Sequence, residues 1–399
     1  MPTSSVNPPK PIPLAEAQAR LFALAAPLSA EFCPTEAANG RFLAAPLAAA
    51  RTQPATDLSA MDGYAMRGDD LAGPWRVVGE SAAGHPYTRA LAAGETVRIS
   101  TGAALPDDGG AVLLQEEAVR DGERLSASGG APTVRHIRRA GFDFRLGDAL
   151  LGAGERMNPG RIALALSGGH GTLSVGRLPT LAVMDSGDEL SVDPSACAPH
   201  QIPASNGAML AAMAAPFAAS IRRIGPVADS MAALQAALER AEGCDVLVTS
   251  GGASVGDHDL VRPALEAWGA KIDFWRVAMR PGKPLMVARR GDQMVLGLPG
   301  NPVSGYVTAF LFLLPLLRHL AGSGAPLPAP LYMRLAAAMS ATGDRMEFAR
   351  GRMADGNVEP FGQQDSSALA SLGGADCLIQ RAAGSAELAA GEVVPVFPL

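Results

Sequence analysis

The chain has 399 residues, of which 48% are hydrophobic and 18% charged, and its formal net charge at pH 7 is −6. This length exceeds that of one ordinary core, so we expect two to four domains. The composition excludes a disordered chain, and the acidic balance argues against nucleic acid as a partner. The four cysteines are scattered without a metal-ligand or disulfide pattern, which favours a reducing compartment, the cytoplasm.

The N-terminal half predicts a flexible tail and two domains, one of them discontinuous. Residues 1–10 are rich in proline and lack the apolar core of a signal peptide. Apolar residues then recur at helical spacing over 14–28, and we assign 11–50 and 141–177 to one helical or mixed domain. Short apolar runs separated by glycine, proline and aspartate turns fill 51–140, which is typical of a β-rich domain.

The C-terminal half predicts an α/β domain followed by a β-barrel. Strands alternate with helices over 178–323, a pattern typical of a parallel sheet covered by helices. The most apolar run, 306–317, is shorter than the ~20 residues of a membrane span and contains Pro315, so we predict a buried helix and no membrane contact. Short strands divided by turns over 324–399 favour a small barrel. The fold class is therefore α/β and multi-domain.

Three predicted strands of the α/β domain run into glycine-containing loops, in AVMDSGDEL, VLVTSGGASVGDHD and VLGLPGNPVS. Because the carboxyl ends of parallel strands share one edge of a sheet, we expect these loops to converge on one ligand site. Glycine backbone at a helix N-terminus favours an anionic ligand. The dinucleotide and nucleoside-triphosphatase fingerprints are both absent. Acids line the second loop, so phosphate would bind there through a hard cation such as magnesium.

Each polar residue of these loops also has a purely structural interpretation. Asp259 and Asp229 stand before predicted helices and are candidate N-caps, and Glu189 is a candidate first-turn acid. His258 has no second histidine or cysteine at metal spacing, and we give it no role. The convergence of three glycine-containing loops, two of them carrying carboxylates, on one sheet edge exceeds what helix capping requires, and it favours a site.

Further candidates lie outside these loops. The segment RVAMRPGKPLMV is either a solvated hairpin tip or an anion clamp, and MEFARGRM with QQDSSALASL either holds a tetrahedral oxyanion or is plain surface. In the β-rich domain, TDLSAMDGYAMR and RISTGAALP are also explained by turn chemistry. The residues concerned are Arg276, Arg280, Lys283, Arg350, Arg352, Ser366, Ser367, Asp57, Ser59, Asp62 and Thr101.

Taken together, these motifs resemble the molybdopterin molybdenumtransferase (MoeA) family, to which the E domain of gephyrin and the plant molybdenum insertase also belong. The resemblance covers nearly the whole chain and rests on the order of SAMDGYA, RISTGAALP, SGDEL, TSGGASVGDHD, RPGKP and LPGNPVS. It implies an elongated homodimer of four-domain chains with an α/β domain like that of MogA and MoaB. Each active site would combine the α/β domain of one subunit with the N- and C-terminal regions of the other.

The activity that the resemblance implies is insertion of molybdenum from molybdate into adenylylated molybdopterin, with magnesium-dependent cleavage of the phosphoanhydride and release of AMP. The implied partners are molybdopterin adenylyltransferase, other proteins of molybdenum cofactor biosynthesis, and apo molybdoenzymes or their chaperones. The implied catalytic residues are Asp57, Thr101, Asp143, Glu189, Asp229, Ser254, Asp259 and Lys283. The implied binding residues are Ser250, Gly251, Gly252, Arg280, Pro299, Asn301, Pro302, Arg350 and Ser366. The implied magnesium ligands are Glu189, Asp229 and Asp259.

The chain departs from the family pattern at three positions. Arg280 stands where many relatives have lysine, Asp185 adds an acid before Ser186 in the first loop, and Leu58 replaces a residue that is commonly polar. Two other functions remain as alternatives. Adenylyl transfer to molybdopterin is disfavoured because that enzyme is normally the α/β domain alone. A non-catalytic scaffold is disfavoured because Asp259 and Lys283 are both present.

Overall fold

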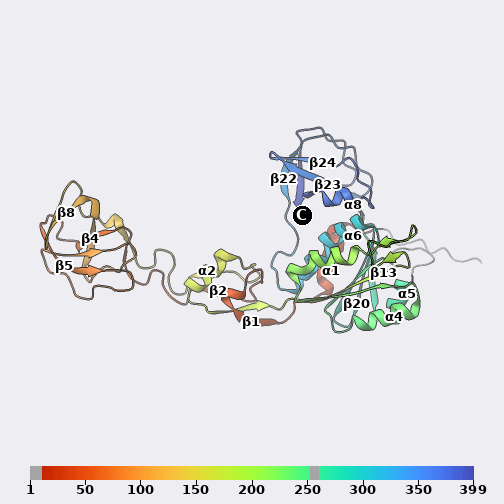
Figure 1. The fold of residues 1–399 in the computed structure, drawn as a ribbon, viewed down its shortest axis with the longest axis horizontal. Helices are drawn as coiled ribbons and strands as arrows, with labels where there is room; N and C mark the ends of the chain where they lie inside the picture. Colours follow the sequence, from red (N-terminus) through yellow and green to blue (C-terminus); the bar gives the residue numbers. More distant parts are fainter. Residues whose placement is uncertain (1–10, 252–259) are drawn as a thin grey trace, which may run out of the picture.

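The computed structural model describes residues 11–251 and 260–399. The molecule is elongated (Figure 1), with the β-rich domain at one end, a small mixed domain next to it, and the α/β domain at the other end beside the barrel. The multi-domain α/β fold expected from the sequence is confirmed.

The β-rich domain is built on a six-stranded sheet in the order β7-β4-β6-β5-β9-β8. In β6, Val97 and Ile99 are fully buried while Arg98 between them is exposed, as the period of two of a half-buried strand requires. The elements are β3 (Leu58–Ser59), β4 (Gly63–Arg67), β5 (Trp75–Ser81), β6 (Glu95–Ile99), β7 (Gly109–Leu114), η2 (Gln115–Glu117), β8 (Ala118–Asp121), β9 (Arg124–Ala127), η3 (Val134–His136) and β10 (Ile137–Arg138).

The small mixed domain is assembled from two separated stretches of the chain. Its elements are β1 (Ala30–Pro34), η1 (Thr35–Ala37), β2 (Leu47–Ala48), β11 (Ala149–Leu151), α2 (Pro159–Ser167) and β12 (Thr172–Gly176). Strand β1 pairs antiparallel with β12, and β2 pairs with β11. Helix α2 begins after Asn158, whose side chain accepts a hydrogen bond from the Arg161 amide at 2.9 Å.

The α/β domain has a six-stranded sheet in the order β16-β13-β17-β21-β20-β18. Four adjacent strands are parallel, as the sequence predicts, and β18 at the edge runs in the same direction. Strand β20 is reversed, because a short turn joins it to β21, and it pairs antiparallel with both β21 and β18. The strands are β13 (Thr180–Ser186), β16 (Ser220–Val227), β17 (Val246–Ser250), β18 (Lys271–Arg276), β20 (Pro284–Arg290) and β21 (Gln293–Leu298). A short parallel pair, β14 (Leu190–Ser191) and β15 (Ile202–Pro203), lies outside this sheet.

Helices cover both faces of this sheet. Alternate strand residues face opposite layers, so Val183 packs in the core with α1, α3, α6 and α7, and Met184 packs with α4 and α5. The helical elements are α1 (Leu14–Leu24), α3 (Asn206–Ala214), η4 (Ala215–Phe217), α4 (Met231–Arg240), α5 (Val261–Ala267), α6 (Pro302–Thr308), the π-helical η5 (Ala309–Leu313) and α7 (Leu314–Leu320). Helix α1 therefore shares a core with the α/β domain, although the small domain follows it in sequence.

One apolar helical run crosses the α/β domain from α6 through η5 to α7. By length and composition Pro302–Leu320 is able to span a membrane, but 83% of it is buried inside the protein, as expected for a core helix. Pro315 has no N–H to offer the carbonyl of Leu311, four residues earlier. The side-chain amide of Gln18, on α1, donates to that carbonyl at 2.9 Å. The proline thus accounts for a buried glutamine that connects α1 to the core helix.

The C-terminal domain is a closed five-stranded barrel. Its strands pair in the order β23-β24-β22-β26-β25, and β25 pairs again with β23 to close the ring. The elements are β22 (Leu331–Leu335), β23 (Met346–Ala354), β24 (Asn357–Pro360), α8 (Leu369–Gly373), β25 (Cys377–Arg381) and β26 (Val393–Pro398). The barrel predicted from the turn-divided strands is therefore confirmed.

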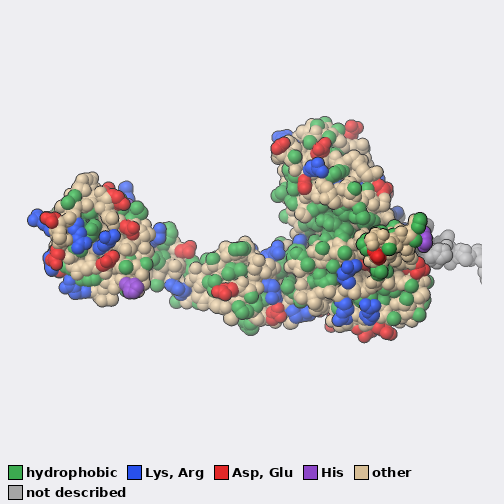
Figure 2. Space-filling view, in the orientation of Figure 1, with side chains coloured by type: hydrophobic (Ala, Val, Ile, Leu, Met, Phe, Trp, Pro, Cys, Tyr) green, Lys and Arg blue, Asp and Glu red, His purple; other side chains and the backbone are tan. Residues whose placement is uncertain are grey.

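Backbone pairing attaches the barrel to the α/β domain. Strand β19 (Met279–Arg280), which lies between β18 and β20 in the chain, pairs in parallel with β23 of the barrel. Just before it, Val277 forms a parallel bridge with Ile12. Figure 2 shows hydrophobic side chains gathered where the barrel meets the α/β domain. The barrel therefore adjoins the α/β domain through both backbone hydrogen bonds and apolar contact.

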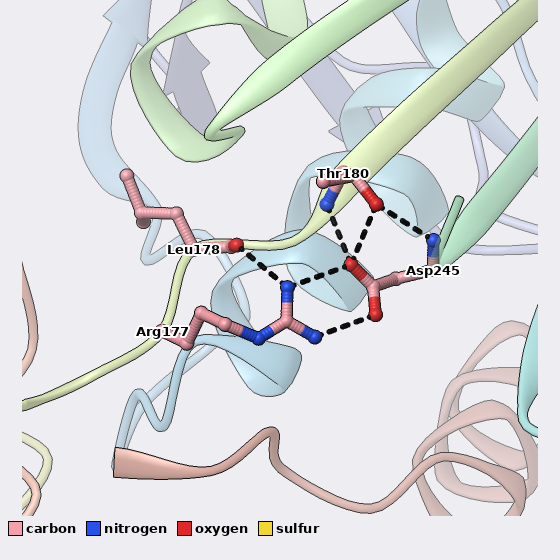
Figure 3. Close-up of polar contacts among 4 residues, drawn as sticks. All are labelled: Arg177, Leu178, Thr180 and Asp245. Carbon is pink, nitrogen blue, oxygen red and sulfur yellow. Dashed lines mark hydrogen bonds and ion pairs between the residues drawn. The ribbon is translucent and has the colours of Figure 1, made fainter. Parts of the chain in front are cut away.

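The chain passes between the small domain and the α/β domain twice, and the two passes lie side by side. The amide of Arg177 donates to the Ser29 carbonyl at 3.0 Å. The Arg177 guanidinium makes two hydrogen bonds to Asp245, at 3.0 and 2.7 Å, and the same carboxylate accepts from the amide and hydroxyl of Thr180 (Figure 3). Four donors on one carboxylate fix the point at which the chain enters the sheet.

Candidate functional site

A cavity of about 900 Å³ lies at the carboxyl ends of β13, β17 and β21. The three glycine-containing loops contribute to its wall, which is the arrangement expected at this edge of a parallel sheet. Ser367 and Leu369 of the barrel complete one side. The structure brings together here seven of the residues singled out in the sequence, namely Glu189, Asp229, Ser250, Gly251, Pro299, Asn301 and Pro302.

Two glycines shape the cavity because a side chain at either position is excluded. Gly251 has φ +95°, its amide donates to the Leu298 carbonyl at 3.2 Å, and a Cβ there would lie 2.9 Å from the carbonyl oxygen of Ser186. Gly187 has φ +151°, and a Cβ there would lie 2.5 Å from Oε2 of Glu189. The Gly251 loop therefore approaches the first loop at a distance that only glycine permits, whereas at Gly187 it is the positive φ that favours glycine.

Asp229 lies on the cavity wall and does not cap the helix that follows it. Helix α4 is capped by Ser230, whose side chain accepts from the Ala233 amide at 3.3 Å. Asp229 instead exchanges hydrogen bonds with Asp188: its amide donates to Asp188 Oδ1 at 3.1 Å, and its Oδ2 accepts from the Asp188 amide at 3.4 Å. The capping interpretation of Asp229 is therefore wrong, and its carboxylate lies beside the loop that carries Glu189.

Two of the three predicted magnesium ligands, Glu189 and Asp229, line this one cavity. Among the described residues, no group of three histidine, cysteine or acidic side chains is arranged to hold a metal ion. Magnesium is commonly held by one or two carboxylates together with substrate phosphates and water, so this pair of oxygen donors fits the ion. The third predicted ligand, Asp259, lies outside the described residues, as do Gly252, Ser254 and His258.

Asp185 also lines the cavity, although it was noted in the sequence only as a departure from the family pattern. It is only 4% exposed, and its Oδ1 has no hydrogen-bond partner among the described residues. Burial raises the pKa of this carboxyl to about 6, against the opposing influence of Arg223 and of the Gly207 amide. A buried acid with a raised pKa in a cavity wall is a feature typical of functional sites.

The barrel contributes a buried arginine next to this cavity. Arg350 on β23 is 1% exposed and donates through Nη2 to the carbonyls of Gln363 and Asp365, at 2.8 and 3.1 Å, while its Nε has no partner among the described residues. Burial lowers the pKa of the Arg350 guanidinium, and the Asp365 carboxylate opposes that shift. The side chain of Gln364 bonds to both the amide and the carbonyl of Arg350, so the segment 363–367 is held against the barrel.

This barrel segment is connected to the third glycine-containing loop. Asn301 donates through Nδ2 to the hydroxyl of Ser366 at 3.0 Å, and the amide of Val303 donates to the Ser366 carbonyl at 3.1 Å. Pro302 occupies the first turn of α6, where its missing N–H costs nothing. Ser366 is therefore next to Ser367 of the cavity wall, and Arg350 contacts the same segment, but neither Arg350 nor Ser366 itself lines the cavity.

The two cations of RPGKP lie at the contact between the α/β domain and the barrel. Arg280, on β19, pairs with Glu347 of the barrel at 3.2 Å. Gly282 has φ +101°, and a Cβ there would lie 2.5 Å from the hydroxyl of Thr308. The exposed side chain of Lys283 makes no hydrogen bond or ion pair within the described part of the chain. Neither cation lines the cavity.

Three predicted catalytic residues, Asp57, Thr101 and Asp143, lie in the β-rich domain or in the segment next to it, and Figure 1 shows that domain at the end of the molecule opposite the α/β domain. Asp57 accepts hydrogen bonds from the Ala140 amide at 2.8 Å and from Arg139. Burial alone would raise the pKa of Asp57, but these two donors outweigh it and lower the pKa.

Thr101 and Asp143 are held by similar local contacts. Thr101 donates from its amide and hydroxyl to Asp62, at 2.6 and 2.9 Å, and the Thr101 amide in particular lowers the pKa of the Asp62 carboxyl. The amide of exposed Asp143 donates to the Gln53 carbonyl. Within one chain, these residues and Asp57 do not reach the cavity lining.

Sequence reasoning overlooked Asn206, at the start of α3. Its side chain donates to the Gly300 carbonyl at 2.7 Å, and both residues line the cavity. In the sequence this residue is one asparagine after a serine, a pattern that ordinary helix capping explains equally well. Only the spatial approach of α3 to the third loop distinguishes the two interpretations.

The fold and the cavity define an α/β enzyme with a ligand cleft at its strand ends, extended by a β-rich arm and a barrel. Consecutive parts of the chain match three family descriptions: the MoeA N-terminal region (domain I and II) over 12–169, a probable molybdopterin binding domain over 182–319, and the MoeA C-terminal region (domain IV) over 332–399.

Whole-chain comparisons agree with these matches. The molybdopterin molybdenumtransferase of Synechococcus elongatus is 34% identical over 94% of this chain and 95% of its own length. The enzyme of that name from a Nostoc species is 36% identical over 72% of this chain and 68% of its own length. The crystal structure of the molybdopterin biosynthesis MoeA protein from Pyrococcus horikoshii superposes with a TM-score of 0.80 at 27% identity, covering 98% of this chain and 99% of that one. The chain belongs to the molybdopterin molybdenumtransferase (MoeA) family, a family of transferases.

Proposed function

We propose that this protein inserts molybdenum into molybdopterin, acting on adenylylated molybdopterin and molybdate and releasing AMP. The observation that carries the proposal is one cavity lined by Glu189 of the first loop and by Asp229, which follows β16, together with Ser367 of the barrel segment that includes Ser366 and contacts Arg350. The substrate likewise has two anionic parts, a phosphoanhydride and the incoming oxyanion. Family membership supports the same reaction.

The acid side of the cavity suits the phosphoanhydride. Magnesium bound there would neutralise phosphate charge and polarise the bond to be cleaved. Glu189 and Asp229 would hold that ion, and the reciprocal bonds between Asp188 and Asp229 keep the two loops together. Gly251 and Ser250 would present donors to the phosphate oxygens. Attack by water and departure of AMP then require no covalent link to the protein.

The barrel side suits molybdate, a compact dianion. Arg350 is already desolvated, and its Nε, which no group in the described ranges satisfies, is a charge-assisted donor for a bound oxyanion. Ser366 presents a hydroxyl held by Asn301. Arg280 and Lys283 add positive charge at the contact between the two domains, where they would attract both substrates.

We further propose that the active unit is a homodimer in which the β-rich arm of one subunit completes the cavity of the other. Asp57, Thr101 and Asp143 are distant from the cavity of their own chain, so they contribute only if a partner brings them there. Large apolar side chains exposed on the small mixed domain and the barrel support a partner contact, since Phe32, Phe142 and Tyr332 are 81%, 74% and 72% exposed.

The proposed cellular setting follows from the chemistry. The enzyme would act in the cytoplasm, receive its substrate from molybdopterin adenylyltransferase, and pass its product to apo molybdoenzymes or their chaperones.

The test is release of AMP and reconstitution of an apo molybdoenzyme after incubation with adenylylated molybdopterin, molybdate and magnesium. Asp229→Asn removes a proposed ligand charge and is expected to lower kcat about 100-fold. An exposed acid at a distant turn, changed as Asp292→Asn, is the matched control. Absence of activity in the wild type, or full activity in Asp229→Asn, would contradict the assignment.

Mixing two inactive variants tests the shared site. In a dimer of Asp57→Asn and Asp229→Asn chains, one cavity carries both defects and the other carries neither. Random reassociation therefore predicts about a quarter of wild-type activity if the arm acts on the partner's cavity. No recovery above the separate variants is expected if each chain completes its own cavity.

A further inference from the structure

Asp185 is the penultimate residue of strand β13 and occupies a position that the surrounding backbone accommodates. A Cβ on Gly207 would lie 2.0 Å from Asp185 Oδ2, and a Cβ on Gly225 would lie 2.4 Å from the Asp185 carbonyl oxygen. Two neighbouring positions must therefore lack a side chain for this carboxylate to lie where it does. An acid retained at such a position requires a reason, because burying a charged group is costly.

The carboxylate of Asp185 serves the N-terminus of α3. Its Oδ2 lies directly against Gly207, the second residue of that helix, because a Cβ there would be 2.0 Å away, and the Gly207 amide acts on this carboxyl as a donor that lowers its pKa. The N-cap residue itself, Ser205, makes no side-chain capping bond. Free amides at a helix start are normally satisfied by the cap residue, and a negative charge there is favoured by the helix dipole. Asp185 therefore caps α3 from the neighbouring strand.

The same helix start is connected to the far side of the cavity. Asn206 donates to the Gly300 carbonyl at 2.7 Å, and Asn301, the next residue, donates to Ser366 at 3.0 Å. A continuous series of contacts thus runs from Asp185 through the first turn of α3 and the loop 298–302 to the barrel. Most of these residues also line the cavity.

We propose that Asp185 is a positioning residue for the reaction: by capping α3 it holds Asn206 against Gly300 and so fixes the loop 298–302 between the acids and the barrel. This inference rests on the proposed function for its kinetic consequence only. The mechanical connection concerns the protein alone and is measurable without substrate.

The electrostatic surroundings of Asp185 support this role. The neighbouring strand β17 and helix α3 carry no titratable side chain, Arg223 on β16 lies 3.8 Å from Oδ2, and Glu189 and Asp229 share the cavity. Burial, opposed by Arg223 and the Gly207 amide, raises the pKa of Asp185 to about 6. The cap is therefore charged at neutral pH and loses its charge as the pH falls through about 6.

Hydrogen–deuterium exchange on the full-length protein tests the connection. In Asp185→Ala, we expect amides at the start of α3 and in 298–304 to exchange about tenfold faster, because losing one buried charge-assisted hydrogen bond is a change of that order. Asn206→Ala keeps the cap, so only 298–304 is expected to change. The control Asp292→Asn, at the opposite end of the sheet, is expected to alter neither segment.

Kinetics then test the consequence for the site. Asp185→Ala is expected to raise KM for adenylylated molybdopterin about tenfold with kcat little changed. The wild-type KM is expected to rise below pH 6, whereas Asp185→Asn, which still accepts the Gly207 hydrogen bond, is expected to lose that pH dependence. A merely structural role would leave the pH profile unchanged.

Three results would overturn the proposal. The first is that residues 298–304 exchange in Asp185→Ala at the same rate as in the wild type, and the second is that this variant has the wild-type KM. The third is that Asp185→Asn has a lower KM than the wild type around neutral pH. The last would mean that Asp185 acts only by repelling the anionic substrate. If the wild-type protein has no activity, the proposed function fails, and the exchange pattern alone decides for or against the connection.

Discussion

Replacing Asp245 by asparagine tests whether the point of entry into the α/β sheet is held by charge. The Asp245 carboxylate accepts four hydrogen bonds, two from Arg177 at 3.0 and 2.7 Å and two from Thr180 at 2.7 and 2.8 Å. In the asparagine variant one oxygen still accepts from Thr180, but the other atom becomes a donor that faces the Arg177 donors. The side chains of Asp245 and Arg177 are 19% and 35% exposed, so solvent reduces the energy of the pair.

The expected cost is about 2 kcal/mol, the order found for hydrogen bonds to charged groups after this reduction. For a domain of this size, that corresponds to a fall of roughly 4–8 °C in its melting temperature. Differential scanning calorimetry of the full-length protein measures the change, with Arg177→Met and the double variant completing a double-mutant cycle. We expect a coupling of about 1 kcal/mol or more between the two positions. If the double variant costs the sum of the two single variants, the reasoning is refuted.

Three further outcomes follow from the structure. Gln18→Leu leaves the buried Leu311 carbonyl without its side-chain donor and should lower the free energy of unfolding by about 1–3 kcal/mol in denaturant titrations. The loss should be smaller in a Pro315→Ala background, where residue 315 supplies an N–H, and an equal loss in both backgrounds would contradict the contact. Arg350→Lys keeps the positive charge but loses the planar guanidinium group, whose Nη2 donates to two carbonyls. The KM for molybdate should therefore rise about tenfold in the AMP-release assay, and an unchanged KM would show that Arg350 does not bind the oxyanion. The Asp245 pKa is lowered because Arg177 and Thr180 outweigh burial, so its stabilisation is present above the ordinary aspartate value of about 3.9 and is lost as pH falls through the folded pKa. The wild-type and Asp245→Asn unfolding curves should therefore converge in acid, and a constant difference between them would exclude this origin.

The sequence predicts the loops of the cavity well because their signal is local. A buried strand followed by glycine and a helix start is recognisable without knowledge of the fold, and the sheet edge then brings Glu189 near Asp229. The barrel and the β-rich domain were predictable for the same reason, from short strands separated by turn residues.

The contacts that hold the cavity together were not predictable in this way. Asn206 and Gly300 lie 94 residues apart, and nothing in either segment indicates the partner. From its position, Asp229 was a reasonable candidate for the N-cap of α4. Ser230 is the N-cap instead, because it stands one residue closer to the helix. Helix α1 carries an apolar stripe at Ala17 and Leu21 that any apolar surface would accept, so its packing against α7 depended on the tertiary fold.

The hydrogen bond between Ser29 and Arg177 has a consequence for how the chain is organised. Everything between these residues leaves the α/β domain and returns to the same spot, and the β-rich domain is enclosed within the small domain in the same manner. The β-rich domain is thus inserted into the small domain, and the small domain is inserted into the unit formed by the α/β domain and the barrel. Because the two ends of the outer part already form a hydrogen bond, a short linker from residue 29 to residue 177 would close it. The cavity and its scaffold form a unit of their own, and the arm is an insertion into a single gap in that unit.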